Sequence, residues 1–379
     1  MTETIDILEA VLARHERGDA YGLATVVSVR GSTYRLPGAR QLVAETGESV
    51  GTVSGGCLDA DVQEVARAVL ASGRPRLITF DLTANDEAIW GWGLGCNGAT
   101  EIFVEPPDSA GLLARRLRDA MSSEQSLAVV TVLESADLAV GSRIFVRADG
   151  SSDGSLGSDA ADRAAGGVAL GALEAGAHQT TQLSASGDRV FVEIVAPPPR
   201  LLVCGAGHDA IPLVRLGSEF GWQVVVTDER GKFLDDDRFP EASHFVQARP
   251  VELAASIDLD RRTDVVVMSH TYLRDVDYLR VMLGSRVRYI GMLGPKARLD
   301  RILGDLRAQG IEILQRDLER IHGPAGLDIG AEGPEEIAYA IMAEILAVRR
   351  GHGAGFLRER KGAIHSGDID AMTSNGGKQ

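Results

Sequence analysis

An internal repeat in the first half of the chain, and alternating strands and helices in the second half, together predict an α/β protein. We expect an N-terminal α+β domain built from the repeat, followed by a C-terminal Rossmann-type doubly wound parallel sheet. The boundary is expected at the prolines 197–199, because a proline run forms a stiff, extended linker. The predicted domains are therefore residues 1–196 and 200–365, with a disordered tail over 366–379.

Bulk composition limits the classes of protein and partner. The 379 residues exceed the roughly 250–300 that one core usually supports, so we expect at least two domains. Hydrophobic residues make up 44% and charged residues 25%, as in globular proteins, and no apolar run approaches the roughly 18 residues of a membrane span. A net charge of −15 opposes nucleic acid and anionic lipid, so neither is expected as a partner. Three scattered cysteines fit a reducing compartment, which predicts a cytoplasmic location.

The repeat defines two halves, at about residues 20–107 and 124–196, each predicted as strand, turn, strand, helix and strand. A helix over residues 1–18 precedes the first half. The helices of the two halves, near 58–71 and 161–175, each end at a glycine suited to a left-handed cap. Positions kept in both halves should serve the scaffold, so the repeated arginine at 40 is expected to pair with a carboxylate. The matched segments are Leu23–Val27 with Leu127–Thr131, Gly38–Arg40 with Gly141–Arg143, and Gly51–Val53 with Gly154–Leu156.

Differences between the halves indicate chemistry that only the first half carries. The first half has Ser54, Gly55, Gly56 and Cys57 where the second has residues 157–160, which contain no cysteine. Glycines allow several amides to face one anion, and the amino end of the following helix favours a thiolate at the cysteine. A thiolate can bind a metal or sulfur, so this loop is a candidate binding site. The alternative is a small, buried, inert cysteine.

A second glycine-rich loop, residues 90–98, also occurs in the first half alone and carries Gly95 and Cys96. Two such loops in one domain predict one shared site. The alternative is a cysteine packed beside the tryptophans of its own loop. We expect no zinc, because two cysteines far apart in the sequence cannot fill four coordination positions. Arg35 has no copy in the second half and is a candidate for binding a phosphate.

The C-terminal domain begins with a buried strand and the turn Gly205-Ala206-Gly207-His208-Asp209-Ala210, which enters a helix over 211–220. The next strand, 223–227, ends at Asp228. In dinucleotide-binding folds the glycines approach a pyrophosphate and the acid binds a ribose 2′-hydroxyl, so this order favours NAD or FAD over NADP. A Rossmann shell without a nucleotide is the alternative, since residues 208 and 209 are bulky. The candidate binding residues are Gly205, Gly207, His208 and Asp228.

His270 ends a predicted strand at its carboxyl edge, the edge that faces the ligand crevice of an open α/β sheet. We therefore count His270 as a cofactor-binding candidate and Asp275 as a plausible neighbour. A strand-end histidine bonded to backbone is the alternative. Cys204, inside the first strand, is expected in the core. The remaining elements are predicted as strands over 264–269 and 287–290 and helices near 275–283, 295–308 and 334–349.

These residues together resemble the XdhC/CoxI family, the accessory proteins of molybdenum hydroxylases such as xanthine dehydrogenase and carbon monoxide dehydrogenase. The resemblance covers nearly the whole chain. It departs from the family pattern at Tyr34, Asp59 and Asn97, where proline, glutamate and glycine are expected. The motifs that carry it are Gly31-Ser32-Thr33 through Pro37-Gly38-Ala39-Arg40, Ser54-Gly55-Gly56-Cys57-Leu58, Gly93-Leu94-Gly95-Cys96, Gly205-Ala206-Gly207-His208, and Gly326-Leu327-Asp328-Ile329-Gly330 followed by Pro334-Glu335-Glu336-Ile337-Ala338.

The resemblance implies a chaperone that binds the molybdenum cofactor, a molybdopterin, and protects it while a cysteine desulfurase supplies its sulfido ligand. The chaperone then delivers the cofactor to the hydroxylase apoenzyme. Cys57 and Cys96 match the cysteine loops of the family. Two alternatives stay open: an NAD- or FAD-dependent oxidoreductase that uses the C-terminal domain, and a non-catalytic adaptor for a molybdoenzyme. The duplicated domain and acidic composition permit a homodimer.

Overall fold

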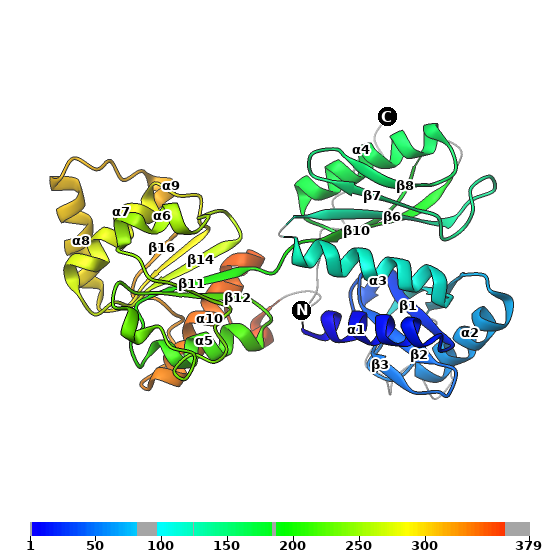
Figure 1. The fold of residues 1–379 in the computed structure, drawn as a ribbon, viewed down its shortest axis with the longest axis horizontal. Helices are drawn as coiled ribbons and strands as arrows, with labels where there is room; N and C mark the ends of the chain where they lie inside the picture. Colours follow the sequence, from blue (N-terminus) through cyan, green and yellow to red (C-terminus); the bar gives the residue numbers. More distant parts are fainter. Residues whose placement is uncertain (1, 82–96, 124, 184–186, 361–379) are drawn as a thin grey trace. The chain divides into compact units, whose positions relative to one another are not determined.

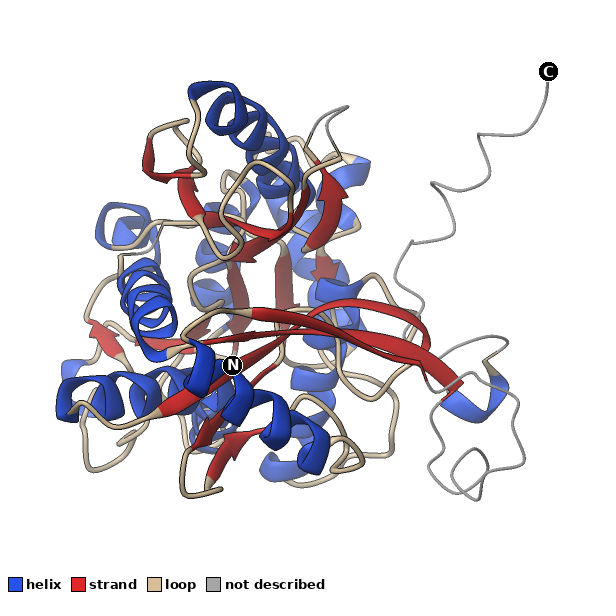
Figure 2. Ribbon diagram, turned by 90° about the vertical axis from the view of Figure 1, so that its right-hand side faces the viewer, coloured by secondary structure: helices blue, strands red, loops and turns tan. Residues whose placement is uncertain are grey.

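The computed structural model describes residues 2–81, 97–123, 125–183 and 187–360 (Figure 1). They divide into two compact units, one over Glu3–Pro197 and one over Pro198–Glu359, which we call the N-terminal unit and the C-terminal unit. Both are mixed α/β, with helices packed against sheets, so the predicted fold class is confirmed (Figure 2). None of the described helices has the length and apolar character that a membrane span requires.

The N-terminal unit consists of two copies of one motif, in the order helix, three strands, helix, two strands. The first copy contains α1 (Thr2–Arg17), β1 (Tyr21–Ser32), β2 (Arg40–Ala44), β3 (Ser49–Gly51), α2 (Asp59–Ser72), β4 (Arg76–Asp81) and β5 (Asn97–Glu105). The second contains α3 (Pro107–Ser122), β6 (Leu127–Glu134), β7 (Arg143–Arg147), β8 (Ser152–Ser155), α4 (Asp159–Ala175), β9 (Gln179–Gln182) and β10 (Arg189–Val195).

The two sheets have the same strand order, β3-β2-β1-β5-β4 and β8-β7-β6-β10-β9, which confirms the internal repeat. All of their strand pairs are antiparallel. The helices α2 and α4 end at glycines in the left-handed conformation, as predicted. Five elements of this unit were not predicted: the helix α3, which is the counterpart of α1, and the four edge strands β3, β4, β8 and β9.

The first strands of the two copies align differently from the sequence match. Thr25 lies opposite Arg40, and Thr131 lies opposite Arg143, so Leu23 corresponds to Val129 and not to Leu127. The two residues of the first pair are 15 positions apart in the sequence and those of the second pair 12, so the first copy has the longer connection. A shift of two residues keeps every side chain on the same face of a strand, and the hydrophobic pattern therefore cannot detect the error.

The strands β3 and β8 each contain a glycine for a steric reason, at the end of β3 and inside β8. Gly51 and Gly154 have φ angles of +79° and +86°. A Cβ at either position would lie 2.6 Å from a backbone carbonyl oxygen, that of Arg40 or Arg143. The close approach of the third strand to the second at this position therefore requires glycine in both copies.

The two copies share one core. The buried apolar faces of α1 and α3 pack together with side chains from both sheets, among them Leu23 and Leu42 of the first sheet and Val129 and Phe145 of the second. Each copy also has a core of its own, where α2 or α4 covers its sheet. The N-terminal unit is therefore one packed body and not two independent domains.

Two buried ion pairs cross between the copies. Arg40 on β2 contacts Glu193 on β10, with Nη2 and Oε2 2.5 Å apart. In the reciprocal pair, Nη2 of Arg143 on β7 lies 2.5 Å from Oε1 of Glu105 on β5. All four side chains are buried. The expected pairing of Arg40 with a carboxylate is thus confirmed, and the carboxylate belongs to the other copy.

The C-terminal unit is a six-stranded parallel sheet in the order β13-β12-β11-β14-β15-β16. Helices α5 and α10 pack on one face, and α7 and α8 on the other. The helix α7 begins three residues earlier than predicted. The elements are β11 (Arg200–Cys204), α5 (Ala210–Glu219), β12 (Gln223–Thr227), β13 (His244–Val246), α6 (Leu253–Ser256), β14 (Thr263–Val267), α7 (Tyr272–Leu283), β15 (Tyr289–Met292), α8 (Lys296–Ala308), α9 (Gln315–Leu318), β16 (Ile321–His322) and α10 (Pro334–Arg350).

Candidate functional site

The loop between β3 and α2 carries the thiol that distinguishes the two copies. Ser54 is buried, and its Oγ accepts hydrogen bonds from the amides of Gly56 and Leu58, at 3.1 and 3.2 Å. Gly56 has a φ of +100°, which glycine adopts without strain. Ser54 therefore fixes the turn that leads into α2. Within the described part of the chain, it leaves the amides of Gly55 and Cys57 without an internal acceptor.

Cys57 is half-buried and packs against the core of the first sheet. The helix α2 begins two residues later. Its first turn holds the carboxylates of Asp59 and Asp61, which already interact favourably with the positive end of the helix dipole. The helix end by itself therefore offers little to a further anion. Any binding at this loop depends on the thiol and on the glycine amides.

A longer connection between β1 and β2 brings Tyr34 against this thiol loop. A Cβ placed on Gly55 would lie 3.6 Å from Cγ of Tyr34, an ordinary van der Waals contact. The tyrosine itself is 64% exposed, so one side of its ring is open to solvent. Sequence reasoning noted Tyr34 only as a departure from the family pattern. The signal that could have found it is the extra length of this connection in the first copy.

Arg35 follows Tyr34 and is partly engaged. Its Nη2 donates to Oε2 of Glu3 at 2.6 Å, while its Nε is buried without a partner among the described residues. The other predicted members of this site, Gly95 and Cys96, lie outside the described residues. Ser32 pairs with Asn97 at the end of the sheet from which the Tyr34 connection departs.

In the C-terminal unit, the glycine turn after β11 is tightly packed. Gly205 has a φ of +120°, and a Cβ there would lie 2.6 Å from the carbonyl oxygen of Met268, just beyond β14. A Cβ on Gly207 would lie 2.5 Å from Oδ1 of Asp209. Gly205 thus allows the turn to pack closely against the end of β14. The carboxylate of Asp209 lies over Gly207. His208 is exposed.

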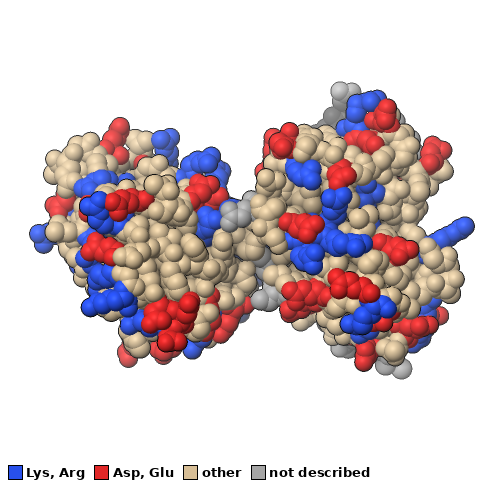
Figure 3. Space-filling model, viewed as in Figure 1, with Lys and Arg blue, Asp and Glu red and all other residues tan. Residues whose placement is uncertain are grey.

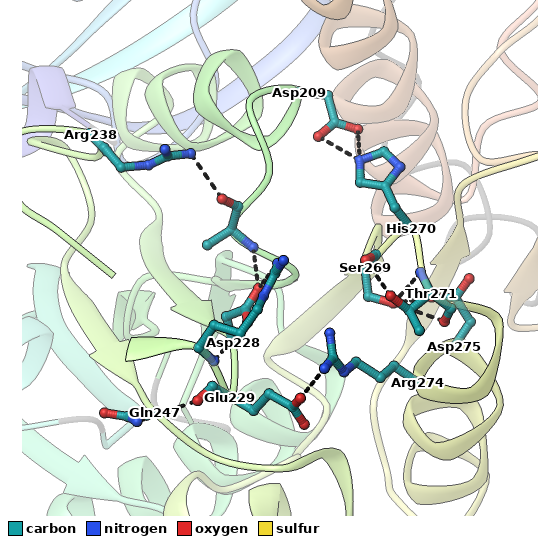
Figure 4. Close-up of polar contacts among 12 residues, drawn as sticks. Asp209, Asp228, Glu229, Arg238, Gln247, Ser269, His270, Thr271, Arg274 and Asp275 are labelled. Carbon is teal, nitrogen blue, oxygen red and sulfur yellow. Dashed lines mark hydrogen bonds and ion pairs between the residues drawn. The ribbon is translucent and has the colours of Figure 1, made fainter. Parts of the chain in front are cut away.

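Asp228 follows β12 and is only 4% exposed. Its carboxylate accepts four hydrogen bonds (Figure 4). One comes from the amide of Ala206 at 3.1 Å, and three come from Arg230, through its amide, Nε and Nη2, at 2.8–2.9 Å. Asp228 therefore ties the glycine turn to the segment after β12, and both of its oxygens are in use.

The protonation of Asp228 should affect stability in acid. Burial alone would raise its pKa, but the hydrogen bonds from the Arg230 side chain and from the two amides lower it from 3.8 to about 2. A lowered pKa contributes stability that is present above pH ~4 and is lost as the pH falls towards 2, about 2 kcal/mol in all. We expect the stability difference between the native protein and Asp228→Asn to shrink over this range. Urea titrations at a series of pH values test this, and a pH-independent difference would contradict it.

His270 occupies the carboxyl edge of the sheet in a left-handed conformation, with a φ of +57°. Its Nε2 lies 3.1 Å from Oδ1 of Asp209 and 3.0 Å from Oδ2, and this contact joins the segment after β14 to the start of α5 (Figure 4). Asp275 is buried and binds Ser269 Oγ at 2.6 Å and Arg298 Nη2 at 2.6 Å. His270 and Asp209 therefore form a polar pair at the edge, while Asp275 holds the strand end in place.

A second polar cluster was missed by sequence reasoning. The hydroxyl of Tyr289 donates to Oε2 of Glu344 at 2.5 Å, and the same oxygen accepts from the amide of Gly326 at 2.9 Å. The His322 ring stacks on Tyr289, with centroids 4.5 Å apart, and its Nδ1 lies 3.4 Å from Glu344. Burial raises the pKa of Tyr289 well above its ordinary value. These contacts join β15, β16 and α10, which no local spacing reveals.

Across the described ranges, no group of three or more His, Cys, Asp or Glu side chains is placed to hold a metal ion. The fold and the sites thus define a class of protein in which a duplicated α+β unit, with a thiol loop in its first copy, precedes a Rossmann unit. Residues 14–81 and 120–184 match the XdhC and CoxI family, and residues 201–345 match the XdhC Rossmann domain. The chain belongs to the XdhC and CoxI family.

Individual relatives agree with this assignment. The chain is 30% identical over 347 residues to a probable xanthine dehydrogenase subunit of Bacillus subtilis strain 168, covering 91% of this chain and 97% of the relative. It is 23% identical over 327 residues to the molybdenum cofactor insertion chaperone PaoD of Escherichia coli K12, covering 86% and 83%. A crystal structure of a xanthine dehydrogenase from Bacillus halodurans, 30% identical, superposes with a TM-score of 0.74 over 93% of this chain and 97% of that one.

Proposed function

We propose that this chain is a maturation factor for a molybdenum hydroxylase. In this proposal it binds the molybdenum cofactor in its N-terminal unit, protects it during sulfuration and inserts it into the apoenzyme. The name of one relative, a molybdenum cofactor insertion chaperone, supports this class of function. The names of two others connect the family to xanthine dehydrogenase. The proposed partners are the hydroxylase apoenzyme and a cysteine desulfurase, and the proposed location is the cytoplasm.

The observation that carries the proposal is the asymmetry between two copies of one scaffold. Both copies have the same strand order and the same obligatory glycine in the third strand. The thiol of Cys57 has alanine at the matching place in the second copy, Ala160, and the connection that carries Tyr34 is shorter there. The scaffold requires neither the thiol nor the longer connection. Their occurrence around one loop indicates a binding site.

The residues of this loop fit the chemical groups of a molybdopterin. A half-buried thiol suits a soft metal or its sulfur ligand, and free amides beside glycines suit a phosphate. The exposed face of Tyr34 offers a surface on which a flat ring system can stack. In the hydroxylase, the cofactor with its sulfido ligand would supply the oxygen-insertion chemistry. Cys57 would hold it, Gly55 would donate an amide, and Tyr34 would exclude water from one side.

The chain itself is not expected to be the hydroxylase. Its sequence contains three cysteines, fewer than the four thiolates that hold a single iron–sulfur cluster of the common type. Cys204, one of the three, is buried in β11 as predicted, and burial raises its pKa well above the ordinary value. A buried, protonated thiol is inert as a ligand. This leaves Cys57 and Cys96 for the proposed cofactor.

The proposal predicts that the native chain, expressed with molybdate, carries about one cofactor per chain. The Cys57→Ala variant should retain about a tenth of that or less, with an unchanged melting temperature, because the half-buried thiol contributes little packing. The measurement is the pterin released on denaturation, quantified by its fluorescence after oxidation. A native chain without pterin would overturn the function, and full occupancy of Cys57→Ala would overturn the site.

The repeat provides a matched control. The double variant Cys57→Ala, Ala160→Cys has the same composition as the native chain but carries the thiol in the second copy. We expect no recovery of cofactor binding, because that copy has a shorter connection beside its loop and Ser158 in place of Gly55. Recovery would mean that the scaffold alone, and not the arrangement around the first loop, determines binding. A Cys96→Ala variant tests the second predicted thiol in the same assay.

A further inference from the structure

A cluster of cations surrounds one aromatic ring in the segment after β12. The guanidinium carbon of Arg230 lies 4.3 Å from the ring centroid of Phe233, Lys232 Nζ lies 5.3 Å away, and the guanidinium carbon of Arg238 lies 5.2 Å away. Nη2 of Arg238 also donates to the carbonyl oxygen of Ala206 at 3.0 Å, inside the glycine turn (Figure 4). The cluster therefore adjoins the turn at the carboxyl edge of the sheet.

This place is where dinucleotide-binding folds recognise the adenosine ribose. An acid at the end of the second strand binds the 2′-hydroxyl of NAD, whereas a nearby arginine accommodates the 2′-phosphate of NADP. Here Asp228 is saturated by Ala206 and Arg230, so it has no oxygen left for a ribose hydroxyl. The same contacts hold Arg230 in place with 39% of its side chain exposed. The preference for NAD or FAD that the sequence suggested was based on an acid free to bind a ribose hydroxyl, and here that acid is occupied.

The other two cations of the cluster, Lys232 and Arg238, are available to bind an anion. Among the described residues, neither Lys232 nor Arg238 forms an ion pair, and Nε of Arg238 is buried without a hydrogen-bond partner. The neighbouring Glu229 is engaged by Arg274. The aspartates at 235–237 are exposed, and no ion pair joins them to the cluster within the described ranges. On the face shown in Figure 3, acidic and basic side chains are interspersed.

We propose that Arg230, Lys232 and Arg238 form a binding site for the 2′-phosphate of an adenosine nucleotide, so that the C-terminal unit prefers NADP(H) to NAD(H). The exposed side of Arg230 would stack on the adenine, as guanidinium groups do on flat rings. Arg238 and Lys232 would neutralise the phosphate, and the buried Nε of Arg238 would gain an acceptor. This site lies in the C-terminal unit and does not depend on the thiol loop.

One contact opposes the pyrophosphate of a whole dinucleotide. The Asp209 carboxylate lies over Gly207, where the glycine turn would receive that group, and His270 holds it there. Repulsion between the Asp209 carboxylate and the pyrophosphate weakens the binding of any dinucleotide, with or without a 2′-phosphate. The ribose site is therefore tested best with a ligand that has no pyrophosphate, and the effect of Asp209 is tested separately.

The experiment measures binding of adenosine bisphosphates to the full chain by calorimetry. We expect adenosine 2′,5′-bisphosphate to bind about tenfold or more tightly than either adenosine 5′-monophosphate or adenosine 3′,5′-bisphosphate. Arg238→Ala should reduce this ratio of affinities by about tenfold or more, and Lys232→Ala should reduce it by less. The matched control is Arg215→Ala, an exposed arginine on α5 outside the cluster, which should change nothing.

Equal affinity for the three nucleotides, no binding at about 1 mM, or an equal effect of Arg215→Ala would each overturn the proposal. With whole dinucleotides, NADPH should bind more tightly than NADH, and Asp209→Asn should strengthen both by a similar factor. A gain confined to NADH would also overturn it. Cys57→Ala should leave all of these affinities unchanged, so failure here is distinct from failure of the proposed cofactor site.

Discussion

Replacing Arg40 by alanine is expected to lower the free energy of unfolding by about 3–5 kcal/mol, one of the two largest effects we predict. The substitution leaves the carboxylate of Glu193 buried in the shared body of the N-terminal unit without its 2.5 Å partner. Desolvating an unpaired charge costs far more than a surface ion pair contributes. Glu193→Ala should be similarly destabilising because it isolates the guanidinium.

Urea unfolding followed by circular dichroism gives the total effect, and hydrogen exchange of peptides from β2 and β10 shows where protection is lost. The control is Arg14→Ala, which removes surface ion pairs with Glu48 and Asp19 and should cost less than about 1 kcal/mol. The double variant Arg40→Met, Glu193→Met should recover most of the loss, because two apolar side chains leave no buried charge. A cost of Arg40→Ala no larger than that of the control would contradict the argument.

The crossed pairs show what a repeated sequence can and cannot predict. Repetition of the arginine in both halves correctly indicated a scaffold role with a carboxylate partner. The partner itself could not be assigned, because the sequence does not say that each copy extends its arginine towards the other. A signal existed in the closing strands, since Glu105 and Glu193 lie at matching positions opposite Leu23 and Val129. Only the strand register makes that match visible.

In the thiol loop, the sequence identified the candidate residues but not their arrangement. The glycine loop was expected to present its amides to an anion, whereas the buried hydroxyl of Ser54 accepts hydrogen bonds from the amides of Gly56 and Leu58. The contact between Tyr34 and Gly55 depends on a connection whose length was hidden by the two-residue error in strand alignment. Local motifs locate a loop, but which of its donors stay free depends on side-chain contacts that no spacing encodes.

The Rossmann unit was predictable because strand, glycine turn, helix, strand and acid occur in one local order. The use made of the acid was not predictable. Asp228 and Arg230 are two residues apart, and their pairing arises from the bend of the chain after β12. The clusters around Glu344 and Asp209 join elements distant in sequence, so only the three-dimensional fold brings their members together.

Gly205→Ala is expected to be the most destabilising small substitution in the C-terminal unit, at about 2 kcal/mol or more. Its φ of +120° is a conformation that side chains rarely adopt, and the new Cβ would lie 2.6 Å from the Met268 carbonyl oxygen. Neither atom can withdraw easily, because the Gly205 amide binds Thr227 and the Met268 amide binds Cys204. The substitution must therefore separate the ends of β11 and β14.

The buried Trp222 of this unit reports the effect through the midpoint of its fluorescence change in urea. Gly304→Ala is the matched control, since this glycine lies inside α8 with nothing within 4 Å of an added Cβ. Alanine there should stabilise the unit by about 0.5–1 kcal/mol, because a helical alanine loses less backbone entropy than glycine. Equal midpoints for the two variants would show that the turn can yield. In that case its glycine would not be required for packing and would instead be kept for a ligand.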